Sequence, residues 1–250
     1  MDNKHKKSTE KQIILYGKHA VFAALNNPRR KIVKILCTVD NLQNIKETCA
    51  KMHIAESFIE VCDKKRIESI LPPASVHQGV ALISLPLEDY SIEEICTICE
   101  NEKNTRVLIL DQVTDPQNIG AIIRSCAAFG VKALIMQNRN SPQENAVIAK
   151  TSVGMSEILP IVRVTNLSRA VETLKKNGFW VLGMDGYAKD YISSVDKSGK
   201  LAVIMGSEGK GMRRLIEESC DITAKIPMEP EVESLNVSNA AAIILYELYK

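Results

Sequence analysis

Residues 201–212 read LAVIMGSEGKGM, an apolar run that leads into a loop with three glycines. A continuous apolar run of this length, bounded by turn residues, is typical of a strand buried on both faces of a parallel sheet. The glycines indicate that the backbone approaches a neighbour closely or adopts a positive φ. Their order, G-x-x-G-x-G, matches neither the dinucleotide fingerprint G-x-G-x-x-G nor the phosphate loop G-x-x-x-x-G-K-[ST]. The stretch therefore predicts a buried strand and a close-contact loop, and it argues against a nicotinamide or ATP site.

Strand and helix patterns alternate through this part of the chain. Residues 106–111 read RVLILD, which is typical of another buried strand, and a polar turn follows. Further patterns predict strands at 131–136, 158–164, 179–184 and 222–226, and helices at 118–129, 167–176, 212–219 and 236–249. Such alternation predicts an α/β domain over residues 105–250, with a parallel sheet covered on both faces. Ligands of these sheets bind in the loops beyond the C-terminal ends of the strands.

The loop after residues 106–111 leads to two polar residues with open roles. Asn118 and Gly120 stand at the expected start of a helix, where free backbone N–H groups attract anions. Asn118 fits such a site, and it fits equally a simple N-cap. Arg124 lies within the apolar segment AIIRSCAAFG. A cation in such a segment needs a partner, which is either a structural ion-pair partner or a phosphate or carboxylate of a ligand.

The loop after residues 222–226 leads into the last helix. Residues 226–242 read IPMEPEVESLNVSNAAA, and Pro227 is expected to end the preceding strand. Ser234 and Asn236 both fit a cap of the helix that follows. The alanines allow close packing, either inside the fold or across a dimer. Each of the three loops, taken by itself, is an ordinary pattern.

The first third of the chain predicts a second, smaller domain. A helix-like pattern at residues 16–25 is followed by alternating short strand and helix patterns, which predicts a small α/β domain over residues 12–86. The acidic stretch at residues 87–104 is expected to link the two domains. Part of it fits a short helix, because Ser91 and Glu94 have the spacing of a capping box.

Positive charge is concentrated near the N-terminus. The whole chain has 32 Lys and Arg against 30 Asp and Glu, but residues 1–34 contain nine basic side chains against two acidic ones. Such an excess either attracts a phosphate backbone or belongs to a solvated tail and a basic helix end. Lys18, Arg29 and Arg30 are the candidate phosphate contacts. His77 fits either an RNA contact or a structural role.

Composition excludes several classes of protein. The chain has 250 residues, 45% of them hydrophobic and 25% charged, which is ordinary for a globular protein. Residues 1–11 are polar and lysine-rich, which predicts a mobile tail rather than a secretory signal, and the absence of an apolar run of about 18 residues argues against a membrane span. Seven scattered cysteines predict reduced thiols and a cytoplasmic protein. Cys96 and Cys99 form one C-x-x-C pair without two further ligands, so no metal is expected.

The three loops together resemble the motifs of the SpoU (TrmH-type) RNA 2′-O-methyltransferases of the SPOUT superfamily. The motifs are N-x-G-A-I-I-R-S-x-x-x-F-G at residues 118–130, V-I-M-G-S-E-G-x-G-M at 203–212, and I-P-M-x-x-x-x-x-S-L-N-V-S-N-A at 226–240. The resemblance covers residues 106–250. In addition, YGKHAV at 16–21 and VHQGVA at 76–81 resemble the small, L30e-like substrate-binding domain of the family. The chain is thus most similar to the subgroup that methylates guanosine in bacterial 23S ribosomal RNA.

The resemblance implies a fold and a cofactor that the patterns alone do not give. In the family, the last strands and helix form a deep trefoil knot that holds S-adenosylmethionine, whereas threaded chains are otherwise so rare that a sequence pattern never predicts them. By resemblance, the cofactor-binding residues are Gly206, Ile226, Met228 and Leu235. The family also implies a homodimer formed through the knotted domain.

The resemblance also implies a reaction, in which a ribose 2′-oxygen attacks the sulfonium methyl group. Arg124 matches the residue that the family implicates, either as proton acceptor or as the group that orients the RNA phosphate and stabilises the developing alkoxide. The remaining polar positions of the catalytic set are Asn118, Glu208, Ser234 and Asn236. Two alternatives to ribosomal RNA methylation remain: the same reaction on transfer RNA, and RNA binding without catalysis.

Overall fold

The structure, a computed structural model, describes residues 11–139 and 141–249. Lys4, Lys6 and Lys7 of the expected tail lie outside the described residues. The chain divides into two compact units. The first comprises the residues up to Glu88 together with Glu144–Ala146, and the second comprises Asp89–Gln143 and the residues from Val147 onward.

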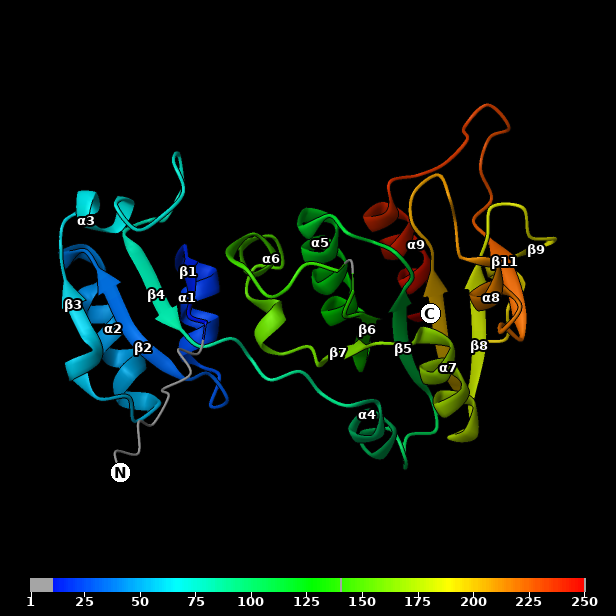
Figure 1. Cartoon of the computed structure of the whole chain (residues 1–250), viewed down its shortest axis with the longest axis horizontal. Coiled ribbons are helices and arrows are strands. Elements are labelled where there is room, and N and C mark those ends of the chain that lie inside the picture. The colour runs from blue at the N-terminus through cyan, green and yellow to red at the C-terminus, as the bar shows by residue number, and fades with distance from the viewer. Residues whose placement is uncertain (1–10, 140, 250) are drawn as a thin grey trace, which may run out of the picture. The chain divides into compact units, whose positions relative to one another are not determined.

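The first unit contains a four-stranded sheet in the order β1-β4-β2-β3 (Figure 1). Strand β4 is antiparallel to both β1 and β2, and β2 and β3 are parallel. Its elements are β1 (Ile13–Tyr16), α1 (Lys18–Leu25), β2 (Ile32–Cys37), α2 (Val39–Lys51), a 3-10 turn (Glu56–Phe58), β3 (Ile59–Val61), α3 (Lys64–Glu68) and β4 (Val80–Ser84). This confirms the α/β class expected for residues 12–86.

Strand β1 is an addition to the expected elements, and it includes Tyr16, which the sequence pattern places at the start of a helix. Gly17 separates strand from helix with a φ of 87°, a conformation that favours glycine. Helix α1 therefore begins only at Lys18, and Ile13–Tyr16 pair with β4 along Ser84–Ala81.

The second unit contains a seven-stranded sheet in the order β7-β6-β5-β10-β8-β11-β9, and every pairing between its described strands is parallel. Its strands are β5 (Thr105–Leu110), β6 (Ala133–Gln137), β7 (Ile161–Val164), β8 (Phe179–Met184), β9 (Asp190–Tyr191), β10 (Lys200–Met205) and β11 (Ile222–Lys225). Its helices are α4 (Ile92–Ile98), α5 (Pro116–Ala128), α6 (Ala146–Thr151, whose first residue belongs to the first unit), α7 (Leu167–Lys176), α8 (Arg214–Glu217) and α9 (Val237–Tyr249), with 3-10 turns at Met155–Glu157 and Ile192–Ser194. The parallel sheet is confirmed, and the implied knot stays a prediction.

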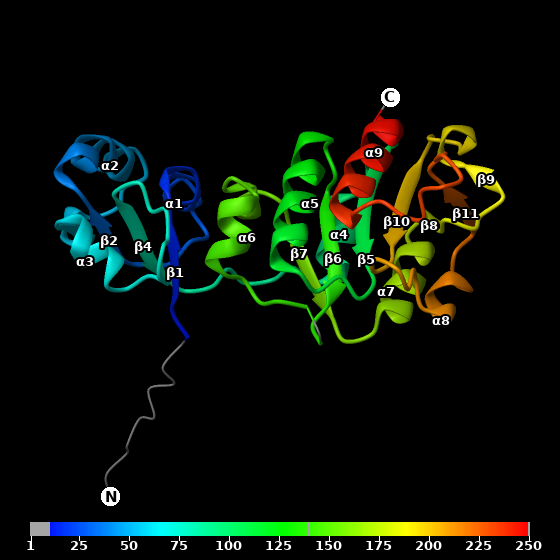
Figure 2. The ribbon, with the colours of Figure 1, turned by 90° about the horizontal axis from the view of Figure 1, so that it is seen from above.

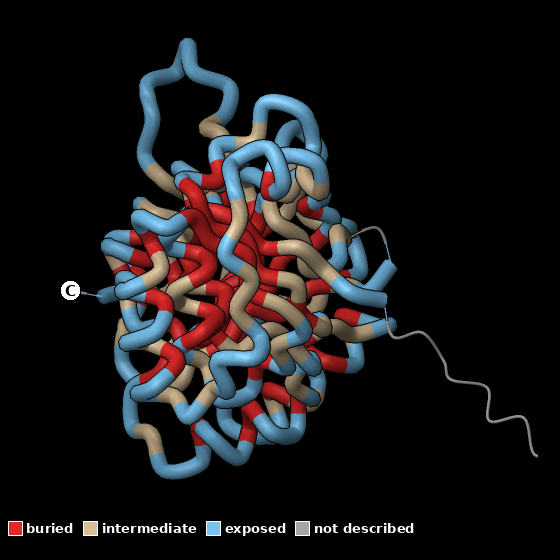
Figure 3. Tube along the Cα trace, turned by 90° about the vertical axis from the view of Figure 1, so that its left-hand side faces the viewer, coloured by how far each residue is buried: buried red, intermediate tan, exposed pale blue. Residues whose placement is uncertain are grey.

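Helices cover both faces of this sheet (Figure 2). Leu108 and Leu110 of β5 belong to a buried cluster that they share with α5 and α9. Val107 and Ile109, which point to the other face, join a cluster formed with α4 and α7. Figure 3 shows the buried segments of the chain in red on the inside and the exposed segments in pale blue around them. Two-sided burial is the reason that β5 has an uninterrupted apolar sequence.

The stretch expected as a linker, residues 87–104, contains an ordered helix. Ser91 and Glu94 form the capping box that begins α4, as expected from their spacing. Ile95 and Cys96 of this helix are buried in the cluster beneath β5. The division between the units accordingly falls after Glu88 rather than after the acidic stretch. No helix of the described residues is long and apolar enough to cross a membrane.

Candidate active site

Three loops with unusual residues leave the same edge of the second sheet. Because β5, β10, β8 and β11 are parallel, their C-terminal ends meet there: Met205 of β10 pairs with Leu110 of β5 and with Met184 of β8, and Ala224 of β11 also pairs with Met184. The loops that begin at Asp111, Gly206 and Ile226 extend from this edge, where the ligands of parallel sheets usually bind.

A pocket of about 770 Å³ lies at this edge, within the second unit. Six of the residues expected in the site line it: Gly206, Glu208, Ile226, Met228, Ser234 and Leu235. Carboxylates predominate among its charged groups, which are Asp185, Glu208, Glu217, Glu229 and Glu233 against Lys210 and Lys225. The pocket therefore suits a ligand with positive charge better than a phosphate.

The glycines of the second loop have distinct structural reasons. A side chain at Gly206 has no room, since a Cβ there would lie 2.0 Å from the carbonyl carbon of Gly211. Ser207 and Gly211 exchange two backbone hydrogen bonds of 3.1 and 2.9 Å, which closes the loop. Gly209 and Gly211 have φ angles of 77° and 66°. The loop is thus a tight turn whose backbone, rather than its side chains, faces the pocket at Gly206.

Asn118 and Asn236 do not line the pocket but contact each other. The side-chain amide of Asn236 donates to Oδ1 of Asn118 at 3.1 Å. Asn118 is not an N-cap: Asp115 caps α5 by accepting from the backbone N–H of Gln117, and Pro116 begins the helix. Asn236 does cap α9, because its Oδ1 accepts from both the backbone and the hydroxyl of Ser238.

Arg124 lies on the exposed side of α5. Among the residues that the structure describes, none forms a hydrogen bond or an ion pair with its side chain. Of the two partners considered from the sequence, the structural ion pair is thus not found in the described part of the chain. The guanidinium remains available for an anionic ligand, although it does not line the pocket.

Sequence reasoning missed the pair formed by Asp111 and Arg213. The Asp111 side chain has no exposed surface, and it accepts hydrogen bonds from the guanidinium of Arg213 at 2.8 and 2.9 Å and from its backbone N–H at 2.8 Å. The acid that ends RVLILD was the available signal, because a buried carboxylate at a strand end requires a cation or donors. Its partner lies 102 positions later, so no local pattern identifies it.

The loop after β8 was also missed, although Asp185, Gly186, Tyr187 and Tyr191 line the pocket. Oδ1 of Asp185 accepts from the backbone N–H of Tyr187, and its backbone carbonyl accepts from Ala188, which folds the loop into a compact turn. The Nζ of Lys225 lies 5.3 Å from the ring centre of Tyr191. The sequence of this loop contains no glycine-rich or repeated polar pattern by which it could have been predicted to be part of a binding site.

Two of the four RNA-binding candidates in the first unit are exposed. Lys18 is exposed at the start of α1, where its backbone N–H donates to the side-chain oxygen of Gln78. Arg29 is exposed in the turn before β2, and its guanidinium donates to the carbonyl oxygen of Glu88 at 2.7 Å. Both side chains can reach a phosphate in solution.

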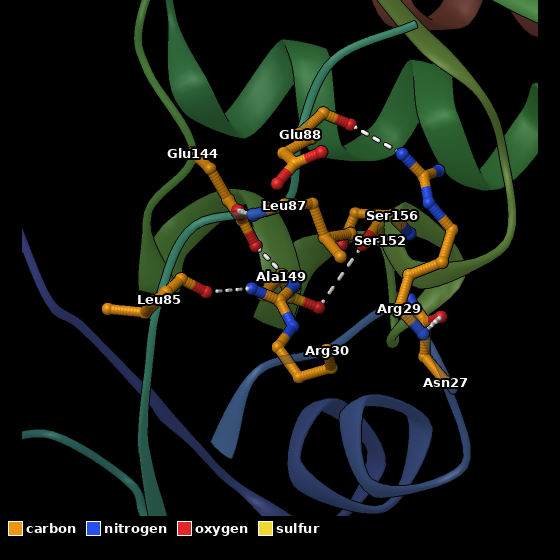
Figure 4. A network of polar contacts seen from close by, with 10 residues as sticks. All are labelled: Asn27, Arg29, Arg30, Leu85, Leu87, Glu88, Glu144, Ala149, Ser152 and Ser156. Atoms are coloured by element: carbon orange, nitrogen blue, oxygen red, sulfur yellow. Dashed lines mark hydrogen bonds and ion pairs between the residues drawn. The ribbon is translucent and has the colours of Figure 1, made fainter. Parts of the chain in front are cut away.

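The burial of Arg30 departs from the expected phosphate contact, and the burial of His77 favours the structural one of its two expected roles. The Arg30 side chain has no exposed surface; its guanidinium donates to the carbonyl oxygen of Leu85 and forms an ion pair with Glu144 (Figure 4). His77 is buried, and its Nδ1 accepts from the backbone N–H of Gly79 at 3.1 Å. Both side chains stabilise the first unit and are not presented to RNA.

The cysteines show packing rather than reactivity. Cys96, Cys99 and Cys126 are buried, and desolvation raises the pKa of each thiol. Burial also raises the pKa of Cys220 to about 11. Among the described residues, no group of three or more His, Cys, Asp or Glu side chains is placed to hold a metal ion.

Comparisons with known proteins agree with this geometry. The SpoU rRNA Methylase family matches residues 105–246, which include all three loops. The chain belongs to the SpoU rRNA methylase family. A second family, described as RNA 2′-O ribose methyltransferase substrate binding, matches residues 14–90. The family resemblance inferred from the motifs is therefore confirmed in both parts of the chain.

Individual relatives of this SpoU chain are similar over nearly their whole length. A 23S rRNA (guanosine-2′-O-)-methyltransferase RlmB of Pasteurella multocida is 36% identical over 94% of this chain and 97% of the relative. A putative TrmH family tRNA/rRNA methyltransferase of Staphylococcus aureus is also 36% identical, over 95% of each chain. The crystal structure of an AdoMet-bound rRNA methyltransferase from Sinorhizobium meliloti superimposes with a TM-score of 0.79 over 95% of this chain and 86% of that one, at 20% identity, which shows a shared fold.

Proposed function

We propose that this protein transfers a methyl group from S-adenosylmethionine to the ribose 2′-hydroxyl of a guanosine in 23S ribosomal RNA. The observation that supports this most directly is the pocket at the C-terminal edge of the sheet, which gathers residues of two SpoU motifs in one place. The near full-length similarity to RlmB, including the substrate-binding part, favours ribosomal RNA as the substrate.

The residues of the pocket fit the cofactor. A volume of about 770 Å³ suits a molecule of this size. Gly206 offers backbone at a point where a Cβ has no room, and Ile226, Met228 and Leu235 offer apolar surface beside it. The excess of carboxylates suits a cofactor with a sulfonium and an ammonium group. When bound, S-adenosylmethionine supplies an electrophilic methyl group.

Arg124 is the residue we assign to the RNA side of the reaction. A ribose hydroxyl is a weak acid, so its oxygen needs help as it loses its proton and gains negative charge. A guanidinium with a pKa above about 12 is a poor proton acceptor but a strong donor to oxyanions and phosphates. We therefore assign Arg124 to orienting the RNA phosphate and stabilising the developing alkoxide, and the phosphate is then the nearer proton acceptor.

The other polar residues support this arrangement in two ways. The hydrogen bond between Asn236 and Asn118 fixes the start of α9 against the start of α5, the helix that also holds Arg124. Glu208 and Ser234 are exposed at the pocket, where each can contact the cofactor or the target ribose. We expect Lys18 and Arg29 of the first unit to contact the RNA backbone.

Transfer RNA is the second candidate substrate, since the relative from Staphylococcus aureus is described as a tRNA/rRNA methyltransferase. The chemistry would be the same, and the substrate-binding part matched at residues 14–90 would then select transfer RNA instead. RNA binding without catalysis is a poorer candidate. It would not require a cofactor-sized pocket, nor an arginine such as Arg124, which has no hydrogen-bond or ion-pair partner among the described residues.

We further propose a homodimer in the cytoplasm. Helix α9 exposes three large apolar or aromatic residues, Ile243, Tyr246 and Tyr249, which are 42%, 51% and 67% exposed. An apolar face on a helix that packs against α5 suits contact with a second copy of the chain. Size-exclusion chromatography with light scattering at micromolar concentration tests this, and a monomer would contradict it. The seven free thiols are compatible with a reducing compartment.

The experiment that tests the function is transfer of tritiated methyl from S-adenosylmethionine to unmodified 23S ribosomal RNA and to bulk transfer RNA, side by side. Label in 23S RNA that is recovered as 2′-O-methylguanosine is the expected result. Label in transfer RNA alone would keep the reaction and change the substrate. Absence of label from both, with the cofactor bound by the protein, would contradict the catalytic assignment.

A further inference from the structure

Asp111 holds both ends of the glycine-rich loop. Where β10 ends, the carbonyl oxygen of Met205 accepts from the backbone N–H of Asp111 at 2.8 Å. Where the loop ends, the backbone N–H of Arg213 donates to Oδ2 of Asp111 at 2.8 Å. The residues between these two bonds, Gly206 to Met212, thus form a loop whose two ends are both bonded to Asp111.

The second of these attachments depends on charge. Besides its backbone bond, Arg213 donates from Nε and from Nη2 to Oδ1 of Asp111, at 2.9 and 2.8 Å. The Asp111 carboxylate is fully buried, whereas the Arg213 side chain is 42% exposed. A buried carboxylate needs this cation to compensate its lost hydration. The half-exposed guanidinium of Arg213 keeps part of its hydration and does not require a partner. The pair therefore mainly compensates the buried charge of Asp111.

The loop itself has little freedom once its ends are held. Ser207 and Gly211 are joined by two backbone hydrogen bonds, and Gly206 is packed against the backbone of Gly211 and Met212. Gln112, directly after Asp111, has a φ of 64°, which is uncommon for a residue with a side chain. A strained backbone is kept only where its surroundings impose it, and Gln112 directly follows the residue that bonds to both ends of the loop.

We propose that Asp111 and Arg213 are a positioning pair, which holds the backbone of residues 206–212 in the conformation that binds S-adenosylmethionine. This inference rests on the proposed function. Neither side chain needs to touch the cofactor: without the pair, the loop would have to be ordered when the cofactor binds, and that cost would weaken binding. The transfer step, once the cofactor is bound, would change much less.

The test uses the full chain with three variants. Arg213→Lys keeps the positive charge but lacks the Nε and Nη2 geometry, and Asp111→Asn keeps the size but lacks the charge. Arg214→Lys is the matched control, because Arg214 is the next residue, its side chain is 86% exposed, and it forms an ion pair with Glu218, the residue directly after the short helix α8. The measurements are the Kd for S-adenosylmethionine, KM and kcat with RNA, the unfolding temperature, and hydrogen exchange of the peptide containing residues 206–212 without cofactor.

We expect Arg213→Lys and Asp111→Asn to raise the Kd and KM for S-adenosylmethionine by about tenfold, as for the loss of one charge-assisted hydrogen bond. The kcat at saturating cofactor should fall by less than about threefold, and exchange in residues 206–212 should become faster, with no such change in Arg214→Lys. A folded Arg213→Lys protein with a lower unfolding temperature but unchanged Kd and loop exchange would overturn the inference. If the variants show faster hydrogen exchange in the loop but the original protein does not bind S-adenosylmethionine, the proposed function would be contradicted instead.

Discussion

The side-chain amide of Asn236 donates a hydrogen bond to the side-chain oxygen of Asn118 at 3.1 Å, although 118 positions separate the two residues. Asn118 lies in the first turn of α5, and Asn236 caps α9. The bond therefore joins the beginnings of two helices that pack side by side on one face of the sheet. It couples the first motif, which contains Arg124, to the third, which lines the pocket.

Replacing Asn236 should separate its two roles. Asn236→Asp keeps an oxygen that can accept from Ser238 but no longer donates to Asn118, so we expect stability within about 0.5 kcal/mol of the original and a clear loss of methyl transfer. Asn236→Ala loses both bonds and should also lower the free energy of unfolding by about 1 kcal/mol. Urea unfolding and methyl transfer are the measurements. Equal activity of Asn236→Asp and the original protein would show that the bond to Asn118 is not needed.

Arg124→Ala should abolish most activity without affecting the fold. The side chain is exposed and has no hydrogen-bond or ion-pair partner among the described residues, and alanine is favourable in a helix. We expect kcat to fall by about 10²- to 10³-fold, with RNA affinity and unfolding temperature nearly unchanged. Arg169→Ala, at an exposed position of α7, is the control and should retain activity. A parallel loss of RNA affinity would mean that Arg124 mainly holds a phosphate.

Two glycine substitutions should differ sharply in stability. Gly206→Ala places a Cβ 2.0 Å from the backbone of Gly211, so the loop must move. We expect the free energy of unfolding to fall by about 2 kcal/mol or more and cofactor binding to be lost. Gly209→Ala meets nothing within 4 Å and has only a positive φ to overcome, which costs about 1 kcal/mol. Denaturant unfolding and calorimetric titration with S-adenosylmethionine would reveal the difference. Similar losses in both variants would contradict the packing argument.

Adjacent arginines in the first unit should respond in opposite ways. Arg30→Ala leaves the carboxylate of Glu144 without its cation and should lower the free energy of unfolding by about 3 kcal/mol. Arg29→Ala should change stability little, but it should weaken RNA binding and reduce the slope of log affinity against log salt by about 1, as should Lys18→Ala. Filter binding over a salt series and thermal unfolding test both statements. An unchanged salt slope for Arg29 and Lys18 would remove them from the RNA interface.

Local patterns were sufficient for much of the fold. The two-sided burial of β5 and β10 makes their sequences uniformly apolar, and the alternation with helices fixes a parallel sheet. That topology alone brings the loops after Leu110, Met205 and Lys225 to one edge. For this reason the sequence predicts a candidate site at that edge, where the structure has a pocket lined by residues of the second and third loops.

Pairings between distant residues could not be predicted in the same way. Arg30 and Arg29 are neighbours with the same chemistry, but Arg30 is buried, with distant partners at Leu85 and at Glu144, 114 residues later, whereas Arg29 is exposed. Asp111 and Arg213 present the same difficulty. In each case a tertiary contact, not a local preference, sets the role of the side chain.

Helix α4 determines where the chain can be cut. Ile95 and Cys96 bury their side chains against the sheet, and Tyr90 joins β7 through a backbone hydrogen bond to Ile161. A recombinant fragment that starts at residue 89 should therefore fold autonomously and stay in solution. A fragment that starts at residue 105, where the family match begins, would expose the apolar groove that α4 fills and should aggregate on expression.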